Sequence, residues 1–345
     1  MKKIQEDIER IVVINLLYLG DLMFAVPFYK NLRCNYPSVR IDIIANSNFS
    51  EILEGIDCFD NVYAYDKSMS IRESFSFGRS LRKNNYDLGI NIHGNWRSVL
   101  LMKLINPGEM AGYADEPGTG LFYDIKLSQN GEQHMVEEYL SFSSHLRLDI
   151  KYRVPQLSVD LPVKGEIRNR LEEKGRDMGK PLVGLNTGGS WPSKRWPEKY
   201  FAKLADKLQL EENAQVVFFG GEGDLERVDR IAEKMESSPL NFAGGTSLME
   251  LAGLADECDL VISGDSGPAH VAAAVDTPVI ALFGPSDEVK YRPYGEIHRV
   301  VKSDVDCRPC GEHKCPEKHY HCMRRIKPGQ IMGMIKKGEK EFPHF

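Results

Sequence analysis

The chain has 345 residues, more than one ordinary hydrophobic core organises, so we expect two domains. Hydrophobic residues make up 42% of the chain and charged residues 27%, with a net charge of −6, which excludes a disordered chain and gives no overall basic field for nucleic acid. No run approaches the roughly 20 apolar residues that span a bilayer, and the N-terminal MKKIQEDIER lacks the apolar core of a signal peptide. We therefore expect a cytoplasmic protein whose contact with the inner membrane, if any, is peripheral.

The first half of the chain alternates apolar runs with segments of helical length. Residues 11–14 (IVVI) form a continuous β-branched run, which is typical of a strand buried on both faces. This run leads to Leu19-Gly20-Asp21 and then to a helical apolar pattern. Further strands are expected at 41–45, 62–65 and 88–92. The alternation predicts a parallel sheet with crossover helices.

A segment with several Pro and Gly residues, 151–165, interrupts this rhythm before it restarts. In the second half, strands are expected at 183–186, 216–219 and 260–263, and helices at 197–210, 225–235 and 248–255. Two such arrays predict an α/β protein with two Rossmann-like domains facing a cleft, residues 1–160 and 161–327. Residues 328–345 begin with a further helical pattern, which is expected to pack back on a domain such as the N-terminal one.

The sequence from Gly264 to His270, GDSGPAH, follows an expected strand and opens a helix. Ligands of open α/β sheets bind beyond the carboxyl ends of the strands. Gly264 and Gly267 allow a ligand to approach the backbone, and the free N–H groups of the first helical turn, with the Ser266 hydroxyl, suit a phosphate. Asp265 and Ser266 are also ordinary helix N-caps, but capping does not account for the glycines together with His270. The pattern predicts a phosphate or diphosphate site.

Two other strand ends carry matching features. One is a glycine turn that leads to a lysine point charge and an arginine fork, both suited to a diphosphate. Its residues are Thr187, Gly188, Gly189, Ser190, Lys194 and Arg195. The other end places Glu222 where nucleotide-binding folds hold ribose hydroxyls. Each feature alone also fits a solvated turn or an acidic helix start. Together the three strand ends predict a nucleotide diphosphate site.

Four motifs in this order resemble glycosyltransferase family 9, the ADP-heptose:lipopolysaccharide heptosyltransferases. They are L-G-D at 19–21 followed by Pro27, N-T-G-G-S-x-P-S-K-R-W-P at 186–197, F-F-G-G-E at 218–222 and G-D-S-G-P-A-H at 264–270. The resemblance spans nearly the whole chain. It implies the GT-B architecture, with the acceptor on the N-terminal domain and the nucleotide sugar on the C-terminal domain. It also implies transfer of heptose from ADP-heptose with inversion at the anomeric carbon.

The resemblance implies roles for individual residues. Asp21 would be the general base, Lys194 would contact the donor phosphates, and Glu222 would contact the ribose. Residues 265–270 would surround the diphosphate and the heptose. Lys194, Arg195 and the helix amides after Ser266 can neutralise a departing diphosphate, so the transfer is expected to need no metal. Without the resemblance, Asp21 also fits a helix N-cap and His270 a packed core histidine.

Four of the seven cysteines crowd into 16 residues: Cys307, Cys310, Cys315 and Cys322. Four thiolates with one C-x₂-C pair suit a tetrahedral structural zinc or a mononuclear iron. His313, His319 or His321 could replace one ligand, and two disulfides or an iron–sulfur cluster are alternatives. Some family 9 proteins look similar here. Cys34, Cys58 and Cys258 are expected to be reduced, buried thiols.

Other functions remain open at this stage. The chain could be a GT-B transferase that uses another nucleotide sugar or a protein hydroxyl acceptor, a nucleotide-sugar epimerase, or a nucleotide-binding protein without turnover. The expected partners are ADP-heptose or another nucleotide sugar and a glycan or lipid-linked acceptor. Arg97 could contact an anionic glycan, while the neighbouring Trp96 fits a packing role equally well.

Overall fold

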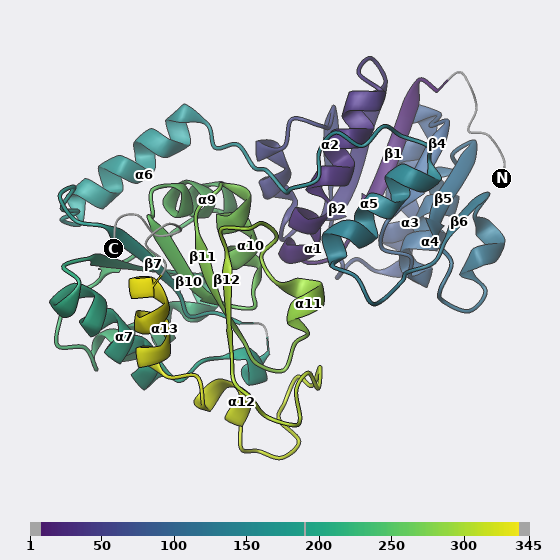
Figure 1. Cartoon of the computed structure of the whole chain (residues 1–345). Helices are drawn as coiled ribbons and strands as arrows, with labels where there is room; N and C mark the ends of the chain where they lie inside the picture. The colour runs from purple at the N-terminus through teal and green to yellow at the C-terminus, as the bar shows by residue number, and fades with distance from the viewer. Residues whose placement is uncertain (1–7, 190, 338–345) are drawn as a thin grey trace. The chain divides into compact units, whose positions relative to one another are not determined.

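The computed structural model describes residues 8–189 and 191–337, so Ser190 lies outside the described residues. The chain divides after Pro155 into two compact units, coloured purple to blue-teal and teal to yellow in Figure 1. Each unit contains its own six-stranded parallel sheet, which confirms the predicted α/β class. Across the described ranges, none of the helices has the length and apolar character needed to cross a membrane.

Unit 1 has the sheet order β3-β2-β1-β4-β5-β6. Its strands are β1 (Arg10–Asn15), β2 (Arg40–Asn46), β3 (Asn61–Tyr65), β4 (Leu88–Asn91), β5 (Glu109–Tyr113) and β6 (Ile125–Leu127). Its helices are α1 (Leu19–Phe24), α2 (Val26–Asn35), α3 (Ile71–Leu81), α4 (Trp96–Ile105) and α5 (Met135–His145), with 3₁₀ turns η1 (Ser50–Gly55), η2 (Arg82–Asn84) and η3 (Thr119–Phe122). Its apolar run 11–14 forms the centre of the sheet and is fully buried.

Unit 2 has the sheet order β12-β11-β10-β7-β8-β9. Its strands are β7 (Leu182–Asn186), β8 (Gln215–Phe219), β9 (Leu240–Asn241), β10 (Leu260–Gly264), β11 (Val279–Phe283) and β12 (Arg299–Lys302). Its helices are α6 (Leu161–Glu173), α7 (Glu198–Glu211), α8 (Leu225–Ala232), α9 (Leu248–Asp256), α10 (Gly267–Ala274), α11 (Glu288–Tyr291), α12 (His321–Arg324) and α13 (Pro328–Lys337), with 3₁₀ turns η4 (Pro192–Lys194) and η5 (Glu222–Asp224).

The two sheets share one topology. Numbered within each unit and followed from the corresponding edge, both orders run third, second, first, fourth, fifth and sixth strand. This is the doubly wound order of dinucleotide-binding folds, in which ligands bind where the strand order reverses. In unit 1 the reversal lies between β1 and β4, and in unit 2 between β7 and β10.

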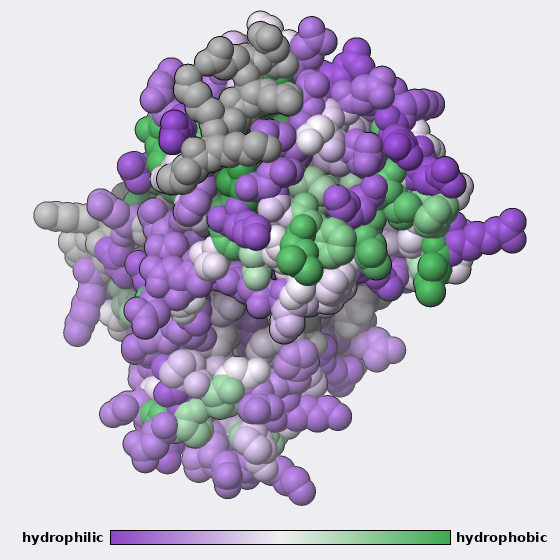
Figure 2. All heavy atoms as spheres, turned by 90° about the vertical axis from the view of Figure 1, so that its right-hand side faces the viewer, coloured by the Kyte–Doolittle hydropathy of each residue, from purple (hydrophilic) through white to green (hydrophobic). Residues whose placement is uncertain are grey.

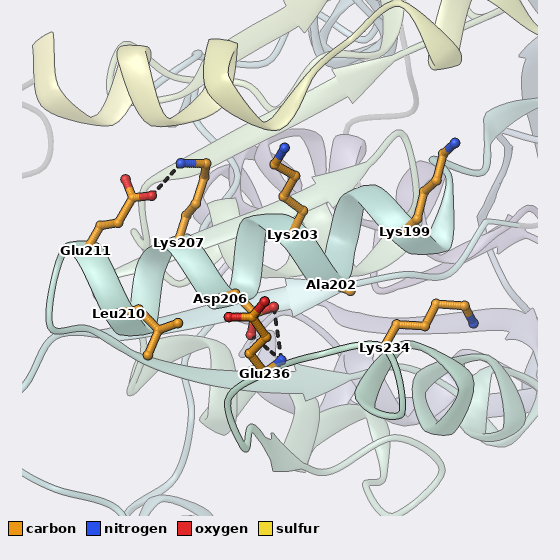
Figure 3. Close-up of a pocket in the computed structure, with 9 residues that line it drawn as sticks. All are labelled: Lys199, Ala202, Lys203, Asp206, Lys207, Leu210, Glu211, Lys234 and Glu236. Atoms are coloured by element: carbon orange, nitrogen blue, oxygen red, sulfur yellow. Dashed lines mark hydrogen bonds and ion pairs between the residues drawn. The ribbon is translucent and has the colours of Figure 1, made fainter.

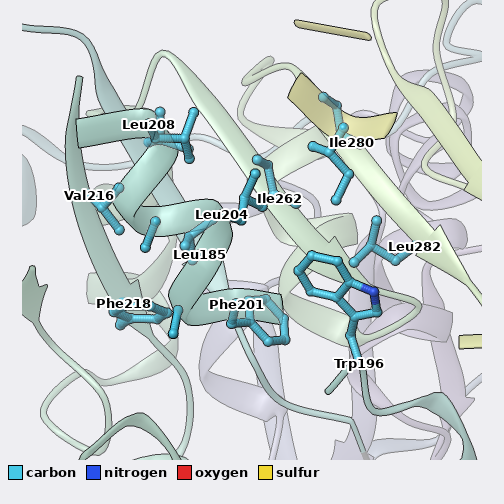
Figure 4. Close-up of a cluster of buried hydrophobic side chains, with 14 of the residues drawn as sticks. Leu185, Trp196, Phe201, Leu204, Leu208, Val216, Phe218, Ile262, Ile280 and Leu282 are labelled. Atoms are coloured by element: carbon cyan, nitrogen blue, oxygen red, sulfur yellow. The ribbon is translucent and has the colours of Figure 1, made fainter. Parts of the chain in front are cut away.

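The core of unit 2 forms between α7 and one face of its sheet (Figure 4). Trp196 and Phe201 pack there with Ile262 and Leu282 and are almost completely buried. The indole Nε1 of Trp196 donates to the carbonyl of Ile326 at 3.0 Å, so its one polar atom is satisfied inside the core.

Helix α13 also belongs to unit 2. Its apolar side chains Ile331, Met332 and Ile335 are buried in the same cluster as α7. The expectation that this helix packs on the N-terminal domain is therefore corrected for the described residues 328–337. The physical reason is the narrow apolar stripe of α13, which the cluster around α7 buries completely.

Candidate active site

Buried polar side chains connect the carboxyl ends of β7, β8 and β10. Asn186 ends β7, and its Nδ2 donates to the carbonyl of Phe219 at the end of β8, at 3.1 Å. The Oδ1 of Asn186 accepts from the hydroxyls of Ser263 at 3.3 Å and Ser266 at 3.2 Å. Because Asn186 and Ser263 are buried, this network fixes the backbone at the point where a ligand would approach.

The Ser266 side chain does not cap α10. Ser266 occupies the N-cap position with extended backbone angles, but its side chain accepts no hydrogen bond from the helix, because it is engaged with Asn186 and Ser263. The interpretation of this serine as an ordinary capping residue is therefore wrong. The first turn of α10, Gly267 and Pro268, starts at the reversal point of the sheet with its positive end free of a side-chain cap.

Thr187, directly after β7, has an unsatisfied hydroxyl at this edge. The side chain is 1% exposed, and its hydroxyl oxygen has no hydrogen-bond partner within the described ranges. An unpaired buried hydroxyl costs about 1–3 kcal/mol, so a polar ligand atom here would be stabilising.

Lys194 and Asp265 form a largely buried ion pair, and His270 lies beside it. The Nζ of Lys194 lies 2.6 Å from Oδ2 of Asp265, and Nε2 of His270 lies 3.9 Å from its Oδ1. Asp265 is only 7% exposed. Burial alone would raise the pKa of this carboxyl group, but the adjacent His270 and Lys194 outweigh burial and hold its pKa at about 2. Asp265 therefore stays ionised and holds the ammonium group of Lys194 at the strand end.

The glycines at two strand ends make room for a carboxylate that the sequence analysis did not single out. A Cβ on Gly188 would lie 2.8 Å from Oδ2 of Asp224, and one on Gly220 would lie 2.7 Å from the same atom. The backbone N–H of Gly221 donates to that oxygen at 3.1 Å. Asp224 thus joins the ends of β7 and β8. Its one sequence signal was its position three residues after the Gly220-Gly221 pair.

The remaining predicted donor residues occupy the same edge of unit 2. Glu222 is exposed and opens η5 after β8. Arg195 is also exposed, and its Nε donates to the carbonyl of Gly189 at 3.0 Å, which ties it to the glycine turn. Ser190 lies outside the described residues. His298 was not among the predicted residues. Burial and the neighbouring His270 lower the pKa of His298 to about 4.

In unit 1, Asp21 lies on α1 directly after β1. Its Oδ1 accepts from the hydroxyl of Tyr139 on α5 at 3.0 Å, and its Oδ2 accepts from the backbone N–H of Tyr18 at 3.4 Å. Burial and the nearby Asp21 carboxylate raise the pKa of Tyr139 well above its usual value, so this phenol stays a hydrogen-bond donor. The interpretation of Asp21 as the N-cap is wrong, because Tyr18 is the N-cap of α1; Asp21 is the N3 residue, whose carboxylate accepts from the N-cap backbone and is oriented further by Tyr139.

Basic side chains lie near Asp21 at the other strand ends of unit 1. Burial lowers the pKa of Lys67, which follows β3, and Asp21 partly opposes that shift. The guanidinium of Arg97 on α4 donates to the Lys67 carbonyl at 2.6 Å. Burial and these two cations lower the pKa of His93 to about 4. The same edge of unit 1 therefore combines a carboxylate with cations.

All seven cysteines lie in the described ranges, and each is a free thiol. Cys307, Cys310, Cys315 and Cys322 line one small cavity of about 30 Å³. Across residues 8–189 and 191–337, no three His, Cys, Asp or Glu side chains are arranged so that they could share a metal ion. Cys58 and Cys258 are buried as predicted, whereas Cys34 is only partly buried.

A hollow of about 420 Å³ on α7 contains none of the predicted site residues (Figure 3). Several of its charged groups are already engaged: Lys207 binds Glu211, Lys234 binds Glu198, and the carboxylate of Asp206 accepts from the backbone N–H of Glu236.

Comparison with known proteins finds relatives along most of this chain. The sequence model of the family described as glycosyltransferase family 9 (heptosyltransferase) matches residues 74–321. Lipopolysaccharide heptosyltransferase 2 of Salmonella typhimurium is 30% identical over 313 residues, covering 85% of this chain and 88% of the relative. The crystal structure of the family 9 glycosyl transferase from Veillonella parvula covers 100% of both chains, with a TM-score of 0.89 and 26% identity. The structure of E. coli ADP-heptose lps heptosyltransferase II covers 95% of this chain and 98% of that chain, with a TM-score of 0.80 and 25% identity.

Proposed function

Because this chain belongs to glycosyltransferase family 9 and is a glycosyltransferase, we propose that it moves heptose from ADP-heptose to a lipopolysaccharide core or a related glycan, with inversion at the anomeric carbon. In this reaction an acceptor oxygen attacks the anomeric carbon, its bond to the diphosphate breaks, and ADP leaves. One group must take the acceptor proton, and others must neutralise the charge that grows on the diphosphate.

Asp21 suits the first role. Its two oxygens are oriented by Tyr139 and by the Tyr18 backbone, and a carboxylate held in this way can take the proton of an acceptor hydroxyl. Lys67 and Arg97 nearby suit an acceptor that carries negative charge.

Lys194 suits the second role, and its setting is the observation that carries the proposal. Its ammonium group is fixed by Asp265 at the edge where α10 begins without a side-chain cap. A lysine and helix amides together supply the positive charge that a departing diphosphate needs, so the chain's own residues suffice for this step.

Calorimetric titration with ADP, ADP-heptose, UDP and GDP tests this proposal. We expect selective binding of ADP and ADP-heptose, at least tenfold weaker in the double variant Lys194→Ala/Asp265→Ala, which leaves no unpaired buried carboxylate. Lys199→Ala, an exposed lysine of the same unit, is the matched control. Preference for UDP or GDP would contradict heptose transfer, and the absence of any nucleotide binding would contradict the site.

The alternatives differ in the product. Transfer to a protein hydroxyl would label a polypeptide, an epimerase would release an isomer from donor alone, and a binding protein would give no product. An Asp21→Ala variant that keeps ADP affinity but loses transfer would exclude the binding protein, since a nucleotide-binding module needs no base.

We also propose that unit 1 contacts an anionic lipid surface peripherally. Ile71 on α3 and Leu121 on η3 are 90% and 85% exposed. The two helices α3 and α4 pack closely at Gly78, and Trp96 of α4 contacts Phe122 of η3 edge-on, so these elements form one face. Phe75 and Leu100 add exposed apolar area to this face, and its exposed charges are Arg72, Arg79, Arg97, Lys103 and Glu73. Figure 2 shows apolar side chains gathered among hydrophilic ones in this view.

Vesicle sedimentation tests this contact. We expect binding to vesicles that contain anionic lipid, loss of binding in Ile71→Ser/Leu121→Ser, and unchanged binding in Met178→Ser, an exposed apolar residue of unit 2. If Ile71→Ser/Leu121→Ser sedimented with these vesicles as the wild type does, this face would not be the one that contacts lipid.

We propose, finally, that Cys307, Cys310, Cys315 and Cys322 hold a structural zinc or a mononuclear iron. The four thiols line one cavity, and both metals prefer four thiolates, but no three of these side chains are arranged around one point in the described residues, so binding requires the thiols to converge on the ion. Elemental analysis of the purified protein should give one metal per chain, and Cys307→Ser/Cys310→Ser should lose it. A metal-free, correctly folded wild-type protein would refute the proposal.

A further inference from the structure

The cysteine-rich segment (residues 303–325) is attached to the edge of unit 2 that holds the donor-site residues. Within this segment, Nε of Arg308 donates to the carbonyl of Gly284 at 2.6 Å, and the backbone N–H of Gly311 donates to the carbonyl of Pro285 at 2.9 Å. Gly284 and Pro285 directly follow β11, so both bonds fix the segment at a strand end.

From there the segment reaches the turn that carries Lys194. The Ser193 side chain is only 2% exposed. Its hydroxyl is within donating distance of two carbonyl oxygens, that of Glu312 at 2.6 Å and that of His313 at 2.9 Å. The imidazole of His313 stacks on the indole of Trp191, with ring centroids 3.9 Å apart and planes 21° apart. Two independent contacts thus join the segment to residues on either side of Pro192.

The same turn determines where Lys194 lies. Its Nζ is 4.1 Å from the centroid of the Trp191 ring and 2.6 Å from Oδ2 of Asp265. Trp191 therefore has His313 stacked against its indole and the Lys194 ammonium close to the same ring. Ser193 also lines the cavity of the four cysteines, so the turn rests directly on that cavity.

We propose that Trp191, Ser193 and His313 are positioning residues through which the cysteine-rich segment holds Lys194 in place for the donor diphosphate. This inference rests on the proposed function of Lys194. Two groups hold the ammonium group of Lys194. The carboxylate of Asp265 pairs with it from the α10 side, and the indole of Trp191 contacts it from the turn. None of the three positioning residues needs to touch the nucleotide.

Calorimetric titration with ADP tests the inference on the full chain. His313 is exposed, so His313→Ala should fold normally, and loss of the stack should weaken ADP binding about three- to tenfold. His313→Phe keeps an aromatic ring and should restore most of the affinity. Glu312→Gln, which changes a side chain but not the carbonyl that Ser193 uses, is the matched control and should bind as the wild type does. In the transfer assay the donor KM should rise while the acceptor KM stays unchanged.

A double-variant cycle separates positioning from direct contact. In the Lys194→Ala/Asp265→Ala background, His313→Ala should have no further effect on ADP affinity, since there is no ammonium group left to position. An equal further loss in that background would overturn the inference, as would wild-type affinity of His313→Ala. Failure of the proposed function is distinguishable, because the wild-type protein would then bind no ADP at all.

Discussion

His298, directly before β12, makes unit 2 sensitive to mild acid. Burial, the neighbouring His270 and Arg299 lower its pKa from 6.5 to about 4, and its Nδ1 is buried without a hydrogen-bond partner within the described ranges. The folded protein therefore binds a proton at this site less readily than the unfolded chain does. The stability that depends on neutral His298 is fully present above pH 6.5 and is lost as the pH falls from 6.5 towards 4.

The size of the effect follows from the two pKa values. Each pH unit inside the window costs up to about 1.4 kcal/mol, so lowering the pH from 7 to 5 should remove about 2 kcal/mol of unfolding free energy through this one residue. In His298→Gln that contribution disappears, and the loss between pH 7 and 5 should be smaller by the same amount.

Urea unfolding followed by tryptophan fluorescence measures this loss. In a Trp96→Phe background the two remaining tryptophans, Trp191 and Trp196, both belong to unit 2, so the signal reports on that unit. His145→Gln, an exposed histidine on α5, is the matched control. An identical loss of stability in the wild type and in His298→Gln would refute the reasoning.

Three further outcomes are expected. Asp21→Asn should lower kcat by about 10²–10⁴ without changing ADP affinity in titration, since a general base contributes that much; an active variant would exclude Asp21 as the base. Tyr139→Phe should lower kcat about tenfold with little change in KM, because only the hydroxyl that orients Asp21 is lost. Steady-state kinetics at saturating donor measures this, and a wild-type kcat would contradict the orienting role of Tyr139. Gly112→Ala should destabilise unit 1 by about 1–3 kcal/mol in urea unfolding, because its Cβ would lie 2.5 Å from the Tyr123 ring; an unchanged midpoint would contradict this packing.

The central strands of both sheets could be predicted because each is a buried apolar run. Five strands were not among those expected: β5, β6, β9, β11 and β12. β5 (EMAGY) lacks β-branched residues, and β9 has only two residues. Edge strands bury less area and so carry a weaker apolar pattern. Residues 225–235 were predicted as helix, but α8 ends at Ala232.

The donor-site residues could be predicted by type but not by pairing. A strand end with glycines and a lysine indicates a phosphate site, yet only the fold shows that Lys194 pairs with Asp265, 71 positions along the chain. Ser266 looks like a cap in sequence because caps are local, whereas its actual partner, Asn186, is on another strand. His298 carries no motif, and its lowered pKa comes from burial and from the nearby His270 and Arg299.

The order of the strands along the chain has a consequence for synthesis. Every strand of the first sheet lies before Pro155, so unit 1 can fold while the rest of the chain is still being translated. At about 5–20 residues per second, the second half takes roughly 10–40 s to emerge, far longer than a domain of this size needs to fold. Unit 2 follows a different schedule, because Ile331, Met332 and Ile335 complete its core from α13, which comes after every strand of its sheet. The apolar face of this sheet on the α7 side therefore stays incompletely covered until α13 has emerged.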